Sequence, residues 1–429
     1  MAHVEDRWMR KARDPDGQYI YRKGKPVMER DPNRYGKGKR WRLRYIGPDG
    51  KELNESFEKK VDAENRKSEV EVDLLKGTYI NPNAGKVTFR KQAEEVIENR
   101  TLDPSTRVAM RQRLAKHVYP VIGSKEIGLL SRRPSIMQAL VKKLDATLAP
   151  SYVKVVMAHV QLVFGVAVSD ELIAKNPASD KNVILPSVVT KKLVPWTAGQ
   201  VLDMRDALPE CYQATIEAGA GIGLRQGEIF GFSPDDVDWI PGVVHVQRQL
   251  KLLKGKLVFA PPKGGKSRDV PLSEDVKVAL SEHVRTIAPI TVTLPWRDVD
   301  GPPCTVRLFF GNREGRAVHP VSFLWTWHRA LEAAGIVPKA AAGESRDPAY
   351  RKHGMHMLRH YFASSLLTGG ETIQAVSEWL GHHDPAFTLR VYVHLMPSSE
   401  QRMRKIIDAA LRRPEIEDHG PEAAQGRPR

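Results

Sequence analysis

Apolar and polar residues alternate along residues 40–46 (RWRLRYI), and this period of two predicts a β-strand. The turn sequence GPDG at 47–50 leads into a second predicted strand at 51–57. Over residues 60–76 the apolar positions fall on one side of a helix, which the following glycine would end as a C-cap. A hairpin followed by a helix predicts a small α+β domain, to which we assign residues 1–85.

The next hundred residues carry apolar positions at helical spacing. Thr88, Asp103 and Pro150 have the character of helix starts, and Pro120 that of a break. The pattern predicts a helical domain over residues 86–190, with helices at 88–100, 104–118, 134–148 and 150–168.

Residues 191–412 mix the two periods, which predicts a mainly helical domain with a small antiparallel sheet. The segments 290–305 and 340–354 are rich in turn residues and are predicted as loops, the second of them mobile. Residues 413–429 are polar and predict a disordered tail. Predicted helices are 197–207, 211–221, 273–287, 320–334, 356–367, 372–380, 385–395 and 398–411; predicted strands are 243–250, 256–260, 268–272 and 306–310.

The predicted fold class is therefore mixed and multidomain. The net charge of the chain indicates what kind of partner it binds. The 429 residues hold 67 Lys and Arg against 51 Asp and Glu, a net charge of +16. Residues 1–45 alone hold 14 against 6, with several aromatic residues between them. Lys and Arg neutralise phosphates, so the expected partner is nucleic acid, and basic strands of this kind could lie in a groove of double-stranded DNA. Arg40, Arg42 and Arg44 on the first predicted strand are the candidate contacts.

Composition excludes several other classes. The two cysteines cannot form a disulfide framework. The most apolar stretch, 153–168, contains Lys154 and is shorter than the roughly 20 residues of a membrane span. The N-terminus has no apolar signal region. We therefore expect a soluble, cytoplasmic protein without a membrane partner.

Six of the 14 histidines fall within residues 353–394. His356 and His360 are four residues apart, as in a zinc-binding helix, but Met357 stands where a metalloprotease needs glutamate. No cysteine is near in sequence. The pattern therefore favours chemistry without a metal ion.

The same region holds cations suited to a phosphate. His356 and Arg359 are three residues apart and share a helix face. Arg225 lies in a glycine-flanked turn, GLRQGEI. Two guanidiniums can each bind non-bridging phosphate oxygens and neutralise the charge that grows in the transition state.

Two further groups complete a reaction centre. Lys263 and Lys266, in PPKGGKSRDVPL, lie on an expected hairpin tip, from which an ammonium can reach a leaving oxygen. Tyr392 lies on a short helix after LGHH. A tyrosine hydroxyl with a pKa near 10 becomes a competent nucleophile only beside cations.

The strings GLRQGEI, PKGGKSRDVPL, HMLRH and LGH, followed by a tyrosine ten residues later, resemble the tyrosine recombinase family. Within that family the chain looks like an integrase of a phage or mobile element from a high-GC, actinobacterial-like host. The segment SYVKVV…ELIAKNP (151–177) resembles the helical core-site DNA-binding domain, and residues 41–66 resemble the small arm-binding domain. The resemblance covers all but about the first 20 and last 15 residues.

The resemblance implies roles for single residues. Glu228 would support the first catalytic arginine, and Lys263 would protonate the leaving 5′ oxygen, with Lys266 as its competitor. The histidine after Leu-Gly would be His382, although counting nine residues back from the tyrosine reaches His383. The implied catalytic set is Arg225, Lys263, His356, Arg359, His382 and the nucleophile Tyr392. In it His356 would act as general base or acid for the tyrosine, since an imidazole titrates near neutral pH.

The family also implies a mechanism and partners. A 3′-phosphotyrosyl intermediate would carry strand exchange through a Holliday junction, with no metal and no cofactor. A homotetramer on attachment-site DNA is implied, with a host bending factor and an excision directionality factor as further partners. Two alternatives stay open: a type IB topoisomerase-like strand transferase, and a catalytically silent DNA-binding regulator.

Overall fold

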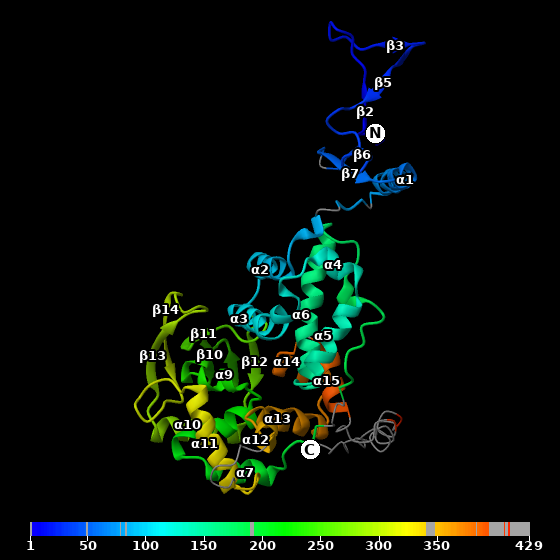
Figure 1. Cartoon of the computed structure of the whole chain (residues 1–429). Helices are drawn as coiled ribbons and strands as arrows, with labels where there is room; N and C mark the ends of the chain where they lie inside the picture. Colours follow the sequence, from blue (N-terminus) through cyan, green and yellow to red (C-terminus); the bar gives the residue numbers. More distant parts are fainter. Residues whose placement is uncertain are drawn as a thin grey trace, which may run out of the picture. The chain divides into compact units, whose positions relative to one another are not determined.

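The structure is a computed structural model, and it describes residues 2–48, 50–77, 79–81, 84–188, 193–339, 348–382 and 384–393, with 407 and 411. The chain divides into two compact units, residues 1–189 and 190–429. Antiparallel strands and helices make up both units, shown in Figure 1. The predicted helix at 398–411 lies almost wholly outside the described residues, and the predicted tail at 413–429 entirely so.

The first unit begins with a three-stranded antiparallel sheet in the order β1 (His3–Asp6), β6 (Trp41–Ile46), β7 (Glu52–Phe57). Helix α1 (Lys60–Lys76) packs on one face of it. The alternation in β6 turns Leu43 and Tyr45 into a small core with Val70 of the helix. The predicted hairpin and helix are confirmed, whereas β1 was not predicted.

Between β1 and β6 the chain leaves the sheet as a two-stranded extension, which we call the hairpin arm (residues 9–30). Strand β2 (Met9–Lys11) pairs with β5 (Met28–Arg30), and beyond them β3 (Tyr21–Arg22) pairs with β4 (Lys25–Pro26). Figure 1 draws the arm beyond β6 and β7. The side chains of Tyr19 and Tyr21 are 45% and 59% exposed. An isolated two-stranded ribbon buries little, so its aromatic residues stay accessible to a partner.

The rest of the first unit is helical. The Thr88 and Asp103 side chains cap their helices as predicted, accepting bonds from the backbone of Lys91 and Ser105. Pro120 does not break the chain's helical course, because wider turns continue from α3 through Gly123. The helices are α2 (Phe89–Asn99), α3 (Pro104–Arg113), α4 (Ile127–Arg132), α5 (Ser135–Asp145) and α6 (Pro150–Ser169). Of these, α4 was not predicted.

Helix α6 is long and apolar enough to cross a membrane by length and composition alone. Val153, Val156, Val160 and Phe164 along it are fully buried against α2, α5 and their neighbours. Its apolar face is therefore occupied by the core of this unit.

The second unit places short helices around small antiparallel sheets. Its helices are α7 (Ala198–Ala207), α8 (Glu210–Ile216), α9 (Gln226–Phe230), α10 (Glu274–Thr286), α11 (Pro320–Ala333), α12 (Pro348–Lys352), α13 (His356–Gly369), α14 (Ile373–Leu380) and α15 (Pro385–Tyr392). Its strands are β8 (Val237–Asp238), β9 (Val243–Val246), β10 (Gln249–Leu253), β11 (Lys256–Ala260), β12 (Arg268–Pro271), β13 (Ile290–Pro295) and β14 (Pro303–Leu308). The predicted fold class is confirmed.

The predicted loop at 290–305 is wrong, because β13 and β14 pair over their full length. The prolines suggested a loop, but Pro295 and Pro303 face each other at the end of the ladder beside the turn. A proline there leaves no ladder bond broken further along. Of the predicted mobile loop at 340–354, residues 340–347 lie outside the described residues and α12 follows.

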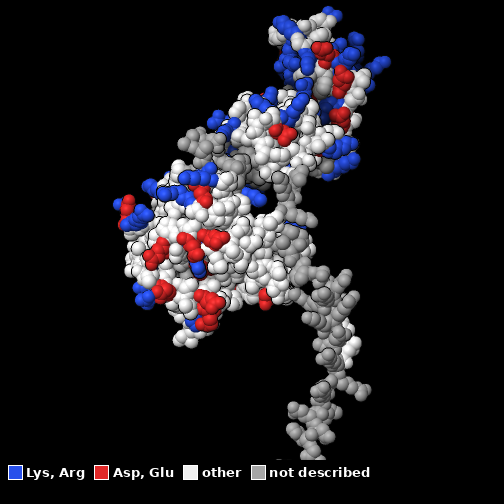
Figure 2. All heavy atoms as spheres, turned by 90° about the horizontal axis from the view of Figure 1, so that it is seen from below, with Lys and Arg blue, Asp and Glu red and all other residues white. Residues whose placement is uncertain are grey.

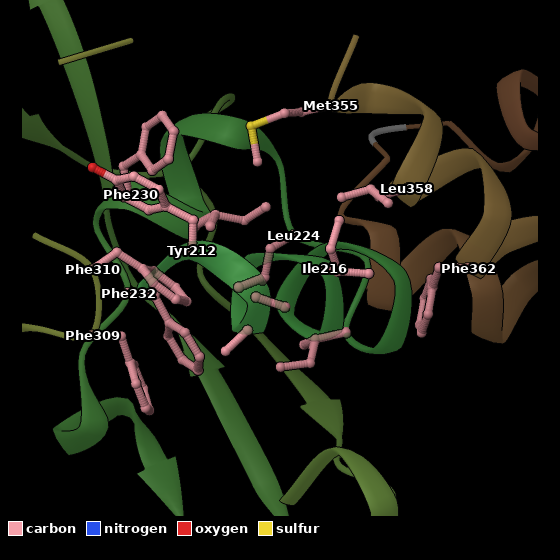
Figure 3. Packing of buried hydrophobic residues seen from close by; sticks show 14 of the residues in the cluster. Tyr212, Ile216, Leu224, Phe230, Phe232, Phe309, Phe310, Met355, Leu358 and Phe362 are labelled. Carbon is pink, nitrogen blue, oxygen red and sulfur yellow. The ribbon is translucent and has the colours of Figure 1, made fainter. Parts of the chain in front are cut away.

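An aromatic core fixes the helices of this unit. Phe230 and Phe323 meet edge to face with ring centroids 4.9 Å apart, and Phe232 stacks on Phe309 at 4.6 Å. Figure 3 shows Leu358 and Phe362 of α13 in the same buried cluster as Ile216 and Leu224. Because α13 is anchored by this packing, the polar side chains on its other faces have fixed positions.

Candidate active site

Arg225 is held where the sequence turns sharply into α9. Gly223 has a φ of +72°, and a Cβ there would lie 2.5 Å from the ring of Phe362, so the turn requires glycine. Arg225 is the N-cap residue, and its backbone N–H and its guanidinium both donate to the Glu228 carboxylate at 2.9 Å. Its side chain remains 20% exposed and can reach a ligand.

Glu228 is buried beneath Arg225 and shared with a second arginine. Arg268 on β12 donates both Nη groups to it, at 3.1 and 2.7 Å. Burial would raise the pKa of the Glu228 carboxyl, but the bond and charge of Arg268 and the charge of Arg225 lower it to about 2. Glu228 is therefore an anion that fixes two guanidiniums.

Sequence reasoning missed Arg268. A signal was present, because residues two apart on a strand face the same side. Arg268 therefore shares the inward face of β12 with Val270, and both are buried. An arginine on the buried side of a strand needs a buried anion, which is Glu228.

Arg359 is the most deeply buried arginine of the cluster, with 1% of its surface exposed. It donates to the carbonyl oxygen of Gly223 at 2.6 Å and to that of Leu380. Burial and the nearby charge of Arg225 lower the pKa of Arg359 to about 9, which still leaves it charged at neutral pH. Two backbone carbonyls and the core set its position.

The C-terminal end of α14 collects all three arginines. Successive carbonyl oxygens accept one bond each: Trp379 from Arg268 at 2.6 Å, Leu380 from Arg359, and Gly381 from Arg225 at 3.4 Å. The last carbonyls of a helix lack intrahelical partners and carry partial negative charge. This helix end therefore gathers positive charge from three separate chain segments.

His382 leaves that helix end through Gly381, which has a φ of +61°. A Cβ at Gly381 would lie 3.0 Å from the Arg268 side chain, so the glycine also allows the close approach. The His382 Nδ1 lies 2.7 Å from the hydroxyl of Thr388, which is fully buried on α15. Burial and Arg359 lower the pKa of His382 to about 3, so its ring is neutral. The alternative, His383, lies outside the described residues.

Tyr392 lies at the end of α15 with 2% of its surface exposed. Its hydroxyl is 2.6 Å from Nδ1 of His360, the histidine considered in the sequence only as a metal ligand. The rings of His360 and His356 meet edge to face at 4.6 Å. Burial raises the pKa of Tyr392 to about 12, against the opposing charge of Arg359.

His356 faces the cations of the site. Burial and then the charges of Arg359, Arg225 and Lys263 lower the pKa of His356 to about 4. Its ring is therefore neutral at physiological pH, beside three positive groups that an arriving phosphate would partly neutralise.

Lys263 and Lys266 lie in the turn between β11 and β12, where Gly264 and Gly265 have positive φ values. Both lysines line one cavity of about 550 Å³ with His382. The cavity leaves both lysines as candidates for the acid, and the charge of Lys263 acts on His356. Across the described part of the chain, no three His, Cys, Asp or Glu side chains are grouped to hold a metal ion.

The arginines predicted to contact DNA are paired with carboxylates. Arg40 lies 2.8 Å from Asp6, Arg42 lies 3.4 Å from Glu5, and Arg44 pairs with Glu52. Arg40 and the strands β1, β6 and β7 hold three Arg against four Asp and Glu, whereas the hairpin arm holds seven Lys and Arg against three. In Figure 2, Lys and Arg are dense at the top of the view, with a smaller number of Asp and Glu between them.

Comparison with known proteins agrees with this geometry. Residues 197–399 match the Phage integrase family, and residues 89–182 match the Phage integrase central domain. The prophage phiRv2 integrase of Mycobacterium tuberculosis is 23% identical over 86% of this chain and 92% of its own length. A tyrosine recombinase XerC-like protein of Caldanaerobacter subterraneus is 26% identical over 55% of this chain, which spans 60% of that protein.

Solved structures share the fold. The Tn1549 transposon integrase in complex with transposon right end DNA has a TM-score of 0.61 at 19% identity, covering 76% of this chain and all of that one. A lambda integrase tetramer bound to a Holliday junction has a TM-score of 0.52 at 15% identity, covering 83% and 93%. With two family matches that together span more than half of its residues, the chain belongs to the tyrosine recombinase family of phage integrases.

Proposed function

We propose that the second unit cuts and rejoins duplex DNA with Tyr392 as nucleophile, to integrate and excise a phage or mobile element. The observation that carries this is the convergence of three arginines on the end of α14, beside a tyrosine hydroxyl that is hydrogen-bonded to a histidine. Arg225 and Arg359 bind the scissile phosphate through N–H groups that the backbone does not use, since a guanidinium has five. His382 and His356 donate further bonds to its oxygens.

The chemical step exchanges one phosphodiester for another. The Tyr392 oxygen bonds to phosphorus, the bond from phosphorus to the 5′ oxygen breaks, and Lys263 gives that oxygen a proton. A 3′-phosphotyrosyl ester results, and attack by a 5′ hydroxyl reverses the step. Because the number of phosphate ester bonds is conserved, the cycle needs no nucleotide hydrolysis, and the charge is stabilised by fixed cations without a metal.

A nicked DNA substrate that loses its leaving strand after cleavage tests the nucleophile. The wild-type chain is expected to form an SDS-resistant adduct in the presence of EDTA, and Tyr392→Phe is expected to form none while it still binds DNA. Tyr212→Phe, a buried tyrosine of α8, is the matched control and should form the adduct. An adduct that survives Tyr392→Phe, or that requires one divalent ion, would overturn the proposal.

The acid is tested by the leaving group. A substrate with sulfur in place of the 5′ oxygen needs no protonation, because a thiolate leaves unaided. Lys263→Ala should lose cleavage of the oxygen substrate and recover it on the sulfur substrate. Recovery by Lys266→Ala in its place would exchange the two assignments.

We further propose that residues 1–85 bind arm-type sites, residues 86–190 bind the core site and residues 191–412 carry catalysis. Recombination of two duplexes needs four active sites, so the working form is a tetramer on DNA, joined by a host bending factor and a directionality factor. A fragment beginning at Lys86 should cleave core DNA and lose protection of flanking sites in footprints. Identical footprints for fragment and full chain would refute the arm-site role, and a strand-exchange assay distinguishes recombination from topoisomerase activity.

A further inference from the structure

The Tyr392 hydroxyl is hydrogen-bonded to His360, a residue to which the family motif assigns no role. The hydroxyl oxygen and His360 Nδ1 are 2.6 Å apart, and the two rings come from α15 and α13. Burial holds the tyrosine in its neutral form, with its pKa raised to about 12. Burial, His356 and Arg359 likewise keep His360 neutral, with its pKa lowered to about 4. In the tautomer of His360 that carries its proton on Nε2, the hydroxyl donates and Nδ1 accepts.

We propose that His360 is the base that takes the proton of Tyr392 when the hydroxyl attacks the scissile phosphate. This rests on the proposed function, in which Tyr392 is the nucleophile. The O–H bond of Tyr392 breaks as its oxygen bonds to phosphorus, and the proton passes to His360 Nδ1 along the existing hydrogen bond. On rejoining, the imidazolium returns the proton to the departing tyrosine oxygen, so one residue serves both directions.

The neighbours of His360 explain why this base acts only with DNA bound. His356 lies edge-on to its ring, and among the described residues Arg359 is the charged group that acts on both His360 and Tyr392. Without DNA, the gap between the two pKa values keeps the proton on the tyrosine. A bound phosphodiester adds negative charge beside Arg359, and an adjacent negative charge favours the imidazolium.

His356 is left with a different task. It faces Arg225, Arg359 and Lys263, the groups that surround the phosphate in the proposed mechanism. A neutral imidazole in that position can donate one N–H to a phosphate oxygen. The two histidines of HMLRH thus separate phosphate binding from proton transfer, one helical turn apart.

Single-turnover cleavage of the nicked substrate tests this assignment. Oδ1 of an asparagine can replace Nδ1 as a hydrogen-bond acceptor but cannot take a proton. His360→Asn and His360→Ala are therefore both expected to cleave about 10²–10⁴-fold more slowly, with DNA affinity retained. His283→Asn removes a buried imidazole from α10, away from Tyr392, and is the matched control for folding.

Adding imidazole to the reaction distinguishes a base from a residue with a purely structural role, because imidazole can replace only the base. It should restore part of the cleavage by His360→Ala, where a space is open, and none by His360→Asn. The rescue should grow as pH rises through neutrality, where imidazole loses its proton. The sulfur substrate should not rescue either variant, because the defect lies in the nucleophile and not in the leaving group.

The proposed function is tested separately, by whether the wild type forms an adduct that Tyr392→Phe does not form. The His360 variants therefore test only the role of His360. Cleavage by folded His360→Asn within about threefold of the wild type would overturn it, because an acceptor without basicity would then suffice. Rescue of His356→Ala by imidazole, with none for His360→Ala, would transfer the role to His356.

Discussion

Two sets of arginine–carboxylate pairs use the same chemistry at opposite levels of burial. In the second unit, Glu228 and Arg268 have 0% and 5% of their side chains exposed and contact each other, and Glu228 also accepts a bond from Arg225. On the N-terminal sheet, Arg44 and Glu52 are 38% and 50% exposed, and Arg44 also lies 3.8 Å from Glu5. Burial makes the first set a rigid support, whereas solvent screens the second.

The comparison shows that an arginine counted in the sequence is not always free to bind DNA, because a neighbouring carboxylate can neutralise it. Arg40, Arg42 and Arg44 are adjacent to acids on neighbouring strands, so the sheet they lie on has little net charge. The hairpin arm has excess cations and exposed aromatic side chains, and among the described residues Arg22, Lys23 and Lys25 at its tip pair with no carboxylate. We therefore expect the hairpin arm, more than the sheet, to supply the salt-dependent affinity for accessory sites.

The largest expected effect comes from breaking the buried set. Glu228→Gln leaves Arg225 and Arg268 without their anion, and removal of one partner from a buried pair costs about 3–5 kcal/mol. Chemical denaturation of the full chain should show this loss in the free energy of unfolding, together with loss of adduct formation. A stability change below about 1 kcal/mol would mean that the cluster is not a buried ionic support.

From the lowered pKa of the Glu228 carboxyl we also expect the folded chain to lose stability in acid. The pKa of Glu228 is lowered from 4.5 to about 2 in the folded chain, so its stabilisation is present above pH 4.5 and is lost as pH falls toward 2. A shift of this size corresponds to about 3 kcal/mol. The difference in unfolding free energy between wild type and Glu228→Gln should shrink over this window. A constant difference would assign the acid loss to other groups.

A smaller effect is expected from Arg268→Ala. Glu228 keeps Arg225 as its partner, so the chain should fold, but Arg225 loses its fixed support. Cleavage should fall about 10- to 100-fold, as for other residues that orient a catalytic group, while affinity for DNA changes little. Arg307, in an exposed pair with Asp235, gives the control Arg307→Ala, which should cleave normally. Equal cleavage rates for Arg268→Ala and Arg307→Ala would show that Arg268 does not orient Arg225.

The difference between these arginines shows which contacts a sequence can reveal. Arg225, His356, Arg359 and Tyr392 belong to short motifs whose spacing is visible in one chain, and the structure gathers them in one unit. Arg268 and His360 lie within or beside the same motifs, but their roles depend on contacts with residues 40 and 32 positions away. Local periodicity carries no information on such distant partners.

The fold follows the same division. Helices with a clear start signal, such as α2 after the cap Thr88 and α6 at Pro150, are predicted nearly to their ends. The hairpin arm and the β13–β14 hairpin were missed, since each is held by cross-strand pairing, with prolines and polar residues that suggest loops. Pairing of this kind is set by tertiary context more than by propensity.

The role of the hairpin arm is tested by comparing two triple variants that remove the same number of positive charges. Arg22→Gln, Lys23→Gln and Lys25→Gln together remove three unpaired cations, and Arg40→Gln, Arg42→Gln and Arg44→Gln remove three paired ones. The first set should weaken binding to accessory-site DNA about tenfold or more and lower the slope of log affinity against log salt by about 1–3. The second should change the slope by less than about 1. The reverse order would place the DNA on the sheet.

The smallest effect is expected when the sheet arginines are released. Glu5→Gln with Glu52→Gln removes the partners of Arg42 and Arg44 and adds two net positive charges to the strands that carry them. If DNA lies mainly on the hairpin arm, these charges act through solvent and are screened beyond about 10 Å, so affinity should rise less than about threefold at physiological salt. Filter binding over a salt series measures the change, with Glu282→Gln on α10 as an exposed control that removes one carboxylate in the other unit. A gain larger than the loss caused by the arm substitutions would mean that the sheet face contacts phosphate directly, and that its acids normally hold that affinity down.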